Sequence, residues 1–140
     1  MNDNTDTVAV HQLRLVVVAE DYEEAVRFYR DILGLSEEFV VDSDGGARVV
    51  ALQAGRATLE IINPAQRHLI DEIEVGHQVS RPIRMAFEVS DATATTDHLL
   101  AAGAQSVAPP TETPWRSLNS RLEAPGGLQI TIFEELDHDG

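Results

Sequence analysis

The sequence predicts an α+β domain built from two consecutive βαβββ modules. Three observations support this fold class. An apolar, β-branched run at 13–18 leads through a capping aspartate into an amphipathic helix. The same order of strand, cap and helix returns roughly 70 residues later, which indicates an internal duplication. Short segments with strand character, separated by glycine-containing turns, are found in both halves of the chain.

The helix of the first module is predicted from a capping residue at its start, an apolar face and a glycine at its end. Asp21 is placed to cap the N-terminus, and Glu24 completes a capping box. One face of the helix is apolar at the i, i+3, i+4 spacing and consists of Tyr22, Ala25, Val26, Tyr29, Ile32 and Leu33. Gly34 is expected to end the helix, because glycine readily adopts the positive φ of a C′ residue.

Three further strands complete the first module, and a connector follows it. The strands are expected at 36–42, 47–54 and 56–62, with a hairpin turn at 43–46 that reads Ser-Asp-Gly-Gly. The connector should hold a short helix that docks through Leu69, Ile70 and Ile73 while the acids Asp71, Glu72 and Glu74 face water. His68 and Glu72 have the i, i+4 spacing of a shared metal site, but we favour a solvated connector.

The second module repeats the order of the first. A strand at 81–89 leads to a helix at 91–102, which Asp91 caps and Gly103 ends. A short strand at 105–108, an extended proline loop at 109–114 and two strands at 117–123 and 128–134 follow. We therefore expect one domain at 12–134, with halves at 12–63 and 81–134, a linker at 64–80, and flexible tails at 1–11 and 135–140.

Composition limits the classes of partner and compartment. The formal net charge of −14 argues against binding to nucleic acid or to an anionic membrane. No apolar run approaches the roughly 20 residues that span a bilayer, and the N-terminus lacks the features of a signal peptide, so a cytoplasmic protein is expected. The absence of cysteine excludes disulfides and cysteine-ligated metal centres.

Three segments carry a resemblance to a known superfamily. They are LRLVVVAEDYEEAVRFYRDILGL at 13–35, RMAFEVSD at 84–91 and APGGLQITIFEE at 124–135. The chain resembles, over 12–134, the vicinal oxygen chelate superfamily of glyoxalases, bleomycin resistance proteins and extradiol dioxygenases. The resemblance implies that the two modules form a curled mixed sheet whose concave face binds a small molecule, and that the protein is a homodimer.

The resemblance also implies four inward positions that hold histidine or glutamate ligands in metal-dependent members. Here they are Arg14, Glu60, Arg84 and Thr131, of which only Glu60 matches. Arginine is always protonated and cannot ligate a cation. None of the five histidines falls on an inward strand position, although His11 lies close to one. We therefore expect no metal and no other cofactor.

Two interpretations of the inward arginines stay open. Arg14, Arg84 and Arg121 are set against Glu60 and Glu88. One interpretation is that an arginine with no acidic partner binds an anionic or carbonyl-bearing ligand through its planar fork. The other is that Arg14 and Arg84 pair with Glu60 and Glu88 and fill the space of a former metal site.

The remaining site prediction concerns the loop before the strand at 117–123. Trp115 lies between prolines and the strand that carries Asn119 and Arg121. It is predicted to close the cavity over a ligand or, alternatively, to plug the barrel end as a core residue. The predicted ligand-binding residues are Arg14, Glu60, Arg84, Trp115, Asn119, Arg121 and Thr131.

Three functions are compatible with these predictions. The favoured one is metal-independent binding of a small molecule, similar to the bleomycin resistance branch. The alternatives are a metal-dependent glyoxalase or dioxygenase, and a metal-free lyase or isomerase with Glu60 as catalytic base. The net charge of −14 favours a cationic ligand, whereas the inward arginines favour an anionic one.

Overall fold

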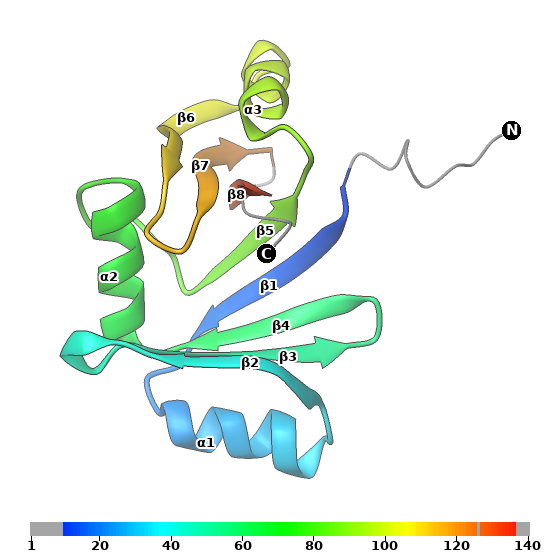
Figure 1. The fold of residues 1–140 in the computed structure, drawn as a ribbon, viewed down its shortest axis with the longest axis vertical. Coiled ribbons are helices and arrows are strands. Elements are labelled where there is room, and N and C mark those ends of the chain that lie inside the picture. Colours follow the sequence, from blue (N-terminus) through cyan, green and yellow to red (C-terminus); the bar gives the residue numbers. More distant parts are fainter. Residues whose placement is uncertain (1–9, 126, 137–140) are drawn as a thin grey trace, which may run out of the picture.

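The computed structural model describes residues 10–125 and 127–136, which form a curled, unclosed eight-stranded sheet with helices outside and inside the curl (Figure 1). The strand order is β2-β3-β4-β1-β5-β8-β7-β6. This arrangement confirms the predicted α+β fold of two βαβββ modules.

The two modules have the same succession of elements. The first contains β1 (Gln12–Val18), α1 (Tyr22–Val26), η2 (Arg27–Ile32), β2 (Ser36–Asp42), η3 (Asp44–Gly46), β3 (Arg48–Ala54) and β4 (Ala57–Ile62). The second contains β5 (Ile83–Glu88), α3 (Ala92–Ala101), β6 (Gln105–Glu112), β7 (Ser117–Ala124) and β8 (Leu128–Glu135). The helix α2 (Pro64–Glu74) links them and has no counterpart in either module.

Strand register shows how the modules correspond. In each module the first strand pairs in parallel with the last, β1 with β4 and β5 with β8, and the antiparallel pair β1–β5 joins the modules. Val16 lies opposite Glu60, and Ala86 lies opposite Thr131. Val16 and Ala86 are 70 residues apart, as are the caps Asp21 and Asp91, so Val16 and Ala86 are equivalent residues of the two modules. Their partners Glu60 and Thr131 therefore occupy equivalent positions.

The predicted helix caps are confirmed. The Asp21 carboxylate accepts the backbone N–H of Glu24 at 3.0 Å. The Asp91 carboxylate accepts the backbone N–H of Ala94 at 2.9 Å. Each cap satisfies an N–H group that has no partner within the helix, and this fixes where the helix begins.

The first helix differs from its prediction in its last turns. Residues Arg27–Ile32 form a π-helix, which has a wider turn than the α-helix and therefore rotates the following side chains. Tyr22 and Val26 are buried as predicted, but Ile32 and Leu33 are 62% and 61% exposed. Their assignment to the buried face is wrong, because it assumed an unbroken α-helical repeat.

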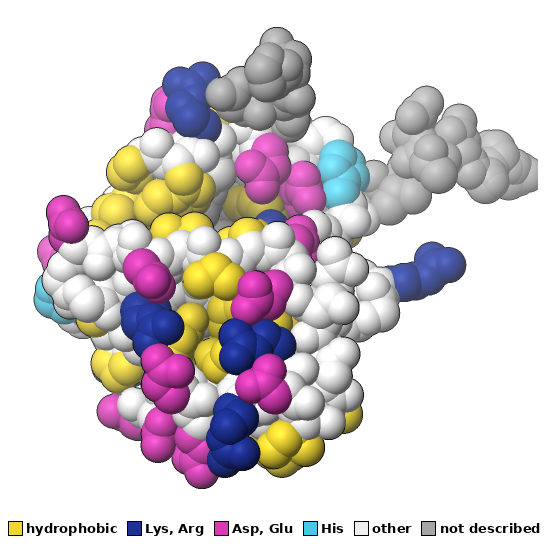
Figure 2. Space-filling model, turned by 60° about the horizontal axis from the view of Figure 1, so that its bottom comes forward, with side chains coloured by type: hydrophobic (Ala, Val, Ile, Leu, Met, Phe, Trp, Pro, Cys, Tyr) yellow, Lys and Arg dark blue, Asp and Glu magenta, His cyan; other side chains and the backbone are white. Residues whose placement is uncertain are grey.

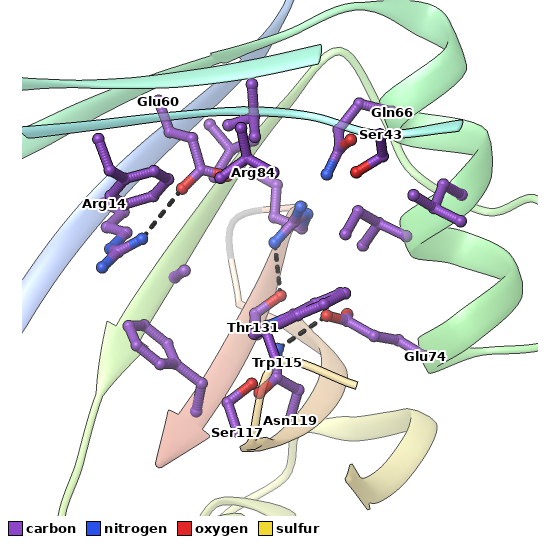
Figure 3. Close-up of a pocket in the computed structure, with 18 of the residues that line it drawn as sticks. Arg14, Ser43, Glu60, Gln66, Glu74, Arg84, Trp115, Ser117, Asn119 and Thr131 are labelled. Carbon is purple, nitrogen blue, oxygen red and sulfur yellow. Dashed lines mark hydrogen bonds and ion pairs between the residues drawn. The ribbon is translucent and has the colours of Figure 1, made fainter. Parts of the chain in front are cut away.

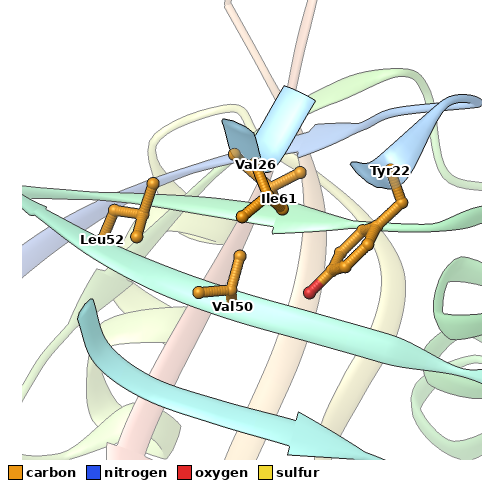
Figure 4. Close-up of a cluster of buried hydrophobic side chains, with 5 residues drawn as sticks. All are labelled: Tyr22, Val26, Val50, Leu52 and Ile61. Atoms are coloured by element: carbon orange, nitrogen blue, oxygen red, sulfur yellow. The ribbon is translucent and has the colours of Figure 1, made fainter. Parts of the chain in front are cut away.

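Apolar side chains on the outer face of the sheet pack beneath the two outer helices. In the first module the core cluster consists of Tyr22, Val26, Val50, Leu52 and Ile61 (Figure 4). In the second it consists of Val89, Ala92, Leu122, Ile130 and Ile132. Since alternate side chains of each strand enter these clusters, the intervening ones face the inside of the curl.

The linker helix α2 is anchored in both modules. At its start the Asn63 side chain accepts the N–H of Gln66 at 2.8 Å and donates to the Gly46 carbonyl at 2.7 Å. At its end Asp71 is fully buried and Glu74 is 5% exposed. The prediction that these two acids face water is wrong, because they turn toward a buried arginine of the second module.

The edge strand β6 is longer than predicted. It continues through 109–112, where an extended loop was expected, and its pairing with β7 shifts register twice. Pro109 and Pro110 are tolerated there because β6 is an edge strand of the described sheet and the register shift between Ala108 and Thr111 leaves both prolines outside the paired residues. The other strands begin or end within two residues of their predicted limits.

The described surface shows local charge pairing. Arg30 pairs with Asp31 and Glu37, and Arg48 pairs with Glu23 and Asp42. On the face that Figure 2 displays, most basic side chains are bordered by acidic ones, and they form no broad basic patch. Within the described part of the chain, no helix has the length and apolar character needed to cross a membrane.

Candidate functional site

A cavity of about 330 Å³ lies inside the curl, between the central strands, α2 and the loop before β7 (Figure 3). Much of its wall is apolar and comes from both modules, with Val16, Val49, Leu69, Ile70 and Phe133 among the lining residues. Pockets that bind small molecules usually combine such a wall with a few polar groups. Six of the seven predicted ligand-binding residues line this cavity: Arg14, Glu60, Arg84, Trp115, Asn119 and Thr131.

Sheet register brings the central polar residues together. Val16 of β1 pairs with Glu60 on one side and with Arg84 on the other, so these three lie in one row. Arg14 and Thr131 both lie beside Ala86 in the next row. The inward orientation that the resemblance implies for Arg14, Glu60, Arg84 and Thr131 therefore matches the structure.

Arg14 is engaged by its neighbours. Its Nη1 donates to Glu60 Oε1 at 3.3 Å, and its Nε donates to Gln12 Oε1 at 2.6 Å. The guanidinium carbon lies 5.2 Å from the ring centre of Phe39 and 5.3 Å from that of Phe133. These contacts fit the interpretation in which an internal ion pair fills part of the cup.

Arg84 is in a different situation. Its side chain is 6% exposed, and Figure 3 shows it reaching into the cavity toward Thr131. Nη1 donates to Thr131 Oγ1 at 2.7 Å, and no described carboxylate lies within 4.0 Å of the guanidinium. Burial lowers the pKa of the Arg84 guanidinium below its ordinary value, and the charge of Arg121 lowers it further. The predicted Arg84–Glu88 pair is therefore not formed.

Arg121 lies behind the cavity wall and does not line the cavity, in contrast to its predicted role as a ligand contact. It is fully buried, and its Nη2 donates to Glu74 Oε1 at 2.7 Å while Nη1 donates to Asp71 Oδ1 at 3.1 Å. Although burial alone raises the pKa of Asp71, hydrogen bonds from Ser80, Val79 and Arg121 outweigh it and hold that pKa below its ordinary value.

Two lining residues from α2, Gln66 and Glu74, were not predicted. Glu74 Oε2 accepts from Asn119 Nδ2 at 2.7 Å, so the helix is connected to the polar floor of the cavity. A signal for this face was present, because Asp71 and Glu74 have the i, i+3 spacing of neighbours on one helical face. This spacing does not show which partner the shared face meets, and here the partner is the buried Arg121 and not solvent.

The four inward positions for which the resemblance implies metal ligands in other members do not form a ligand set in this chain. Arg14 and Arg84 have no lone pair to donate, and the Thr131 hydroxyl already accepts a hydrogen bond from Arg84. Glu60 alone has a suitable oxygen, whereas a protein-bound cation needs several ligands. Among residues 10–125 and 127–136, no three His, Cys, Asp or Glu side chains group closely enough to hold an ion.

The histidines near the sheet have other surroundings. His11 Nε2 lies 2.9 Å from Ser90 Oγ at the surface, away from the cavity. His68 is exposed and its backbone carbonyl accepts from Gln78, so it does not join Glu72 in a metal site. His138 lies outside the described residues.

Trp115 stands at the cavity mouth and is 46% exposed. Its loop is tied at both ends, since the Thr113 N–H donates to the Ser117 carbonyl at 2.8 Å and the two hydroxyl oxygens lie 2.8 Å apart. An indole that is half exposed over an apolar cavity offers a flat contact surface for a ligand. A side chain that plugged the core would be buried, so the exposure of Trp115 does not fit that interpretation.

Comparison with known proteins agrees with this architecture. A family model described as Glyoxalase/Bleomycin resistance protein/Dioxygenase superfamily matches residues 11–132. A search of curated proteins gives no match.

Three solved structures illustrate the likeness in fold. Methylmalonyl-CoA epimerase from Mycobacterium tuberculosis has a TM-score of 0.61 at 21% identity, covering 92% of this chain and 89% of its own. A hypothetical protein from Bacillus halodurans C-125 has a TM-score of 0.63 at 14% identity, covering 94% and 96%. A variant of 4-hydroxymandelate synthase from Streptomyces coelicolor has a TM-score of 0.61 at 22% identity, covering 92% of this chain but 39% of its own. At these identities the likeness concerns the fold alone.

Proposed function

Because this chain belongs to the Glyoxalase/Bleomycin resistance protein/Dioxygenase superfamily, we propose that it uses the cavity inside its sheet to bind a small molecule. We further propose that the ligand is anionic, that Arg84 holds it, and that no metal takes part. The observation that supports this proposal is a buried guanidinium that faces a cavity and has no acidic partner among the described residues.

The physical reason lies in the desolvation of Arg84. A buried charge is strongly disfavoured unless a counter-charge or several hydrogen bonds replace its water. The one protein hydrogen bond in the described structure goes to Thr131 and uses only part of the guanidinium. A carboxylate can accept two parallel N–H bonds from arginine, which would supply both the missing charge and the missing acceptors.

Two of the other acids that line the cavity have partners, whereas Glu135, which also lines it, has no ion pair among the described residues. Glu60 pairs with Arg14, and Glu74 accepts hydrogen bonds from Arg121 and Asn119. Arg84 thus remains as the buried cation without a described acidic partner, which favours a ligand with one anionic group. The net charge of −14 belongs to the molecule as a whole, and its effect at distance is screened by salt.

Calorimetric titration with a matched pair of ligands tests the proposal. We expect hydrocinnamate to bind and its neutral amide, hydrocinnamamide, to bind at least about 10-fold more weakly, because a hydrogen bond to a charged group contributes about 1.5 to 3 kcal/mol. Arg84→Gln should abolish the preference for the acid, and the control Arg14→Gln should retain it.

Two results would contradict this function. One is a failure of the wild type to prefer an acid, seen either as equal affinity for hydrocinnamate and its amide or as no binding of hydrocinnamate, phenylacetate and octanoate. The other is a stoichiometric transition metal in protein purified without chelator, which would favour the metal-dependent enzyme class instead.

A second candidate function uses Glu60 as a general base. Its Oε1 accepts from Arg14, no hydrogen bond to Oε2 is found within the described residues, and it lies two strands away from Arg84 in the same row. Two strand spacings separate the two backbones by about 10 Å, and both side chains line the same cavity. Glu60 would take a proton from the carbon beside a carbonyl, and the electron pair would pass to the carbonyl oxygen, where Arg84 would stabilise the negative charge.

Deuterium exchange distinguishes this enzyme from a pure binding protein. A phenylacetyl thioester of N-acetylcysteamine in D₂O should lose its α-proton NMR signal faster with the wild type than with Glu60→Gln. The binding of hydrocinnamate should be similar for both proteins, which controls for the fold. An exchange rate equal to that of the protein-free solution would leave binding as the sole function.

A further inference from the structure

Two buried amide oxygens beside the cavity have no hydrogen-bond partner. They are Gln66 Oε1 and Asn119 Oδ1, and neither accepts a hydrogen bond from any described residue. Both side chains are 7% exposed and both line the cavity that contains Arg84. Figure 3 shows Gln66 and Asn119 on opposite sides of the Arg84 guanidinium.

The orientation of the Asn119 amide is fixed by its surroundings. Nδ2 donates to Glu74 Oε2 at 2.7 Å, and Glu74 is itself held by Arg121 Nη2 at 2.7 Å. A flipped amide would place its oxygen against the Glu74 carboxylate, which has no donor to offer. Asn119 Oδ1 must therefore lie on the side of the amide away from Glu74, where it can act only as an acceptor.

An acceptor left in this state destabilises the ligand-free protein. A buried polar group without a partner costs about 1 to 3 kcal/mol, and such groups in native proteins are usually satisfied by water or by a bound molecule. Asn119 differs in this respect from the neighbouring lining residue Glu74, both of whose carboxylate oxygens accept hydrogen bonds. The cavity thus combines a guanidinium donor with a nearby acceptor that has no protein donor in the described structure.

We propose that the ligand is an apolar carboxylate that also carries a hydrogen-bond donor, such as a hydroxyl, and that Asn119 selects for this donor. The inference rests on the proposed binding of an anion by Arg84 and extends it to the class of ligand. The carboxylate contacts Arg84, the hydroxyl donates to Asn119 Oδ1, and the apolar body packs against Val16, Leu69 and Phe133. Because Oδ1 is covered in the structure, neighbouring side chains adjust when the hydroxyl enters.

The selectivity should be visible with ligands that differ by one oxygen. Phenyllactate has the skeleton of hydrocinnamate with one added hydroxyl beside the carboxylate. We expect the wild type to bind phenyllactate at least about 10-fold more tightly, because a site built to accept a hydrogen bond discriminates against an analogue that lacks the donor. Calorimetric titration of both acids measures the ratio without any substitution.

Two variants assign the selectivity to Asn119. Asn119→Leu should reduce the ratio of affinities to below about 3-fold, since its side chain has no acceptor. Arg30→Gln, which removes an exposed arginine that does not line the cavity, should keep the wild-type ratio. Thermal unfolding of each variant checks that it is folded, and the wild-type ratio remains informative if Asn119→Leu is not.

The outcomes separate this inference from the proposed function. Equal affinity of the wild type for both acids would overturn the inference and leave anion binding by Arg84 in place. A preference that persists in folded Asn119→Leu would overturn the role of Asn119. Failure of the wild type to bind either acid would overturn both.

Discussion

The two modules place an arginine at the same inward position and treat it differently. In the first, Arg14 pairs with Glu60 of the neighbouring strand at 3.3 Å. In the second, Arg84 meets Thr131, the counterpart of Glu60, and receives a hydroxyl acceptor at 2.7 Å where a carboxylate would supply a counter-charge. One difference between equivalent residues therefore separates an internal ion pair from a buried guanidinium without an acidic partner among the described residues.

The same comparison holds one strand further out in the sheet. Ala51 lies opposite Glu60 in the first module, and Arg121 lies opposite Thr131 in the second. Both are fully buried, but only Arg121 requires acids, which α2 supplies as Asp71 and Glu74. The two equivalent positions thus differ in charge, and the second carries a buried polar cluster in which Arg121 Nε has no hydrogen-bond partner among the described residues.

The largest expected effect comes from removing the buried arginine of this cluster. Arg121→Met leaves Asp71 and Glu74 buried without their cation, and such a loss lowers the free energy of unfolding by about 3 to 5 kcal/mol. Arg14→Met breaks the partly exposed pair of the first module and should lower it by about 1 kcal/mol or less. Urea denaturation of both variants measures the difference, and equal losses would contradict the contrast between the modules.

Exchanging the distinguishing residues should transfer the ion pair. Thr131→Glu gives Arg84 the partner that Arg14 already has, so the affinity for hydrocinnamate should fall about 10- to 100-fold. In the reciprocal variant Glu60→Thr, Arg84 stays free and Arg14 loses its acid, so binding should be retained. Calorimetry of the two variants tests this, and undiminished binding by folded Thr131→Glu would show that Arg84 does not hold the ligand.

The smallest expected effect is a pH dependence that comes from Asp71 at the end of α2. The pKa of Asp71 lies below its ordinary value of 3.8 in the folded protein, so the unfolded chain binds more protons in that range. The stability from Asp71 is therefore present above about pH 4 and is lost as pH falls through the folded pKa. Asp71→Asn should reduce the slope of unfolding free energy against pH.

Asp31 provides the matched control for this measurement. Its pKa is also lowered, by hydrogen bonds from Arg30, but the pair is exposed. Salt screens such a pair, so any contribution of Asp31→Asn to the slope should disappear in high salt while that of Asp71→Asn persists. Equal sensitivity of both slopes to salt would contradict the buried character of the Asp71 contacts.

Much of the site was predictable because it depends on local rules. Strand alternation sorted the side chains into two faces, the family resemblance placed Arg14, Glu60, Arg84 and Thr131 on the inward one, and each capping aspartate fixed the start of its helix. The acids of α2 were misassigned because the buried face of a helix depends on what packs against it, and Arg121 is distant in sequence. Likewise, no local pattern states whether Arg84 finds a carboxylate, since that depends on the neighbouring strand.

The two attachments of α2 have a consequence for how the molecule comes apart. Its first turn is tied to the β2–β3 turn through Asn63, and its last turn is tied to β7 through Glu74 and Arg121. The seam between β1 and β5 joins the same two modules a second time. Neither module can open away from the other without breaking a buried ion cluster or a central strand pair, so a chain with two visible repeats should melt in a single cooperative transition.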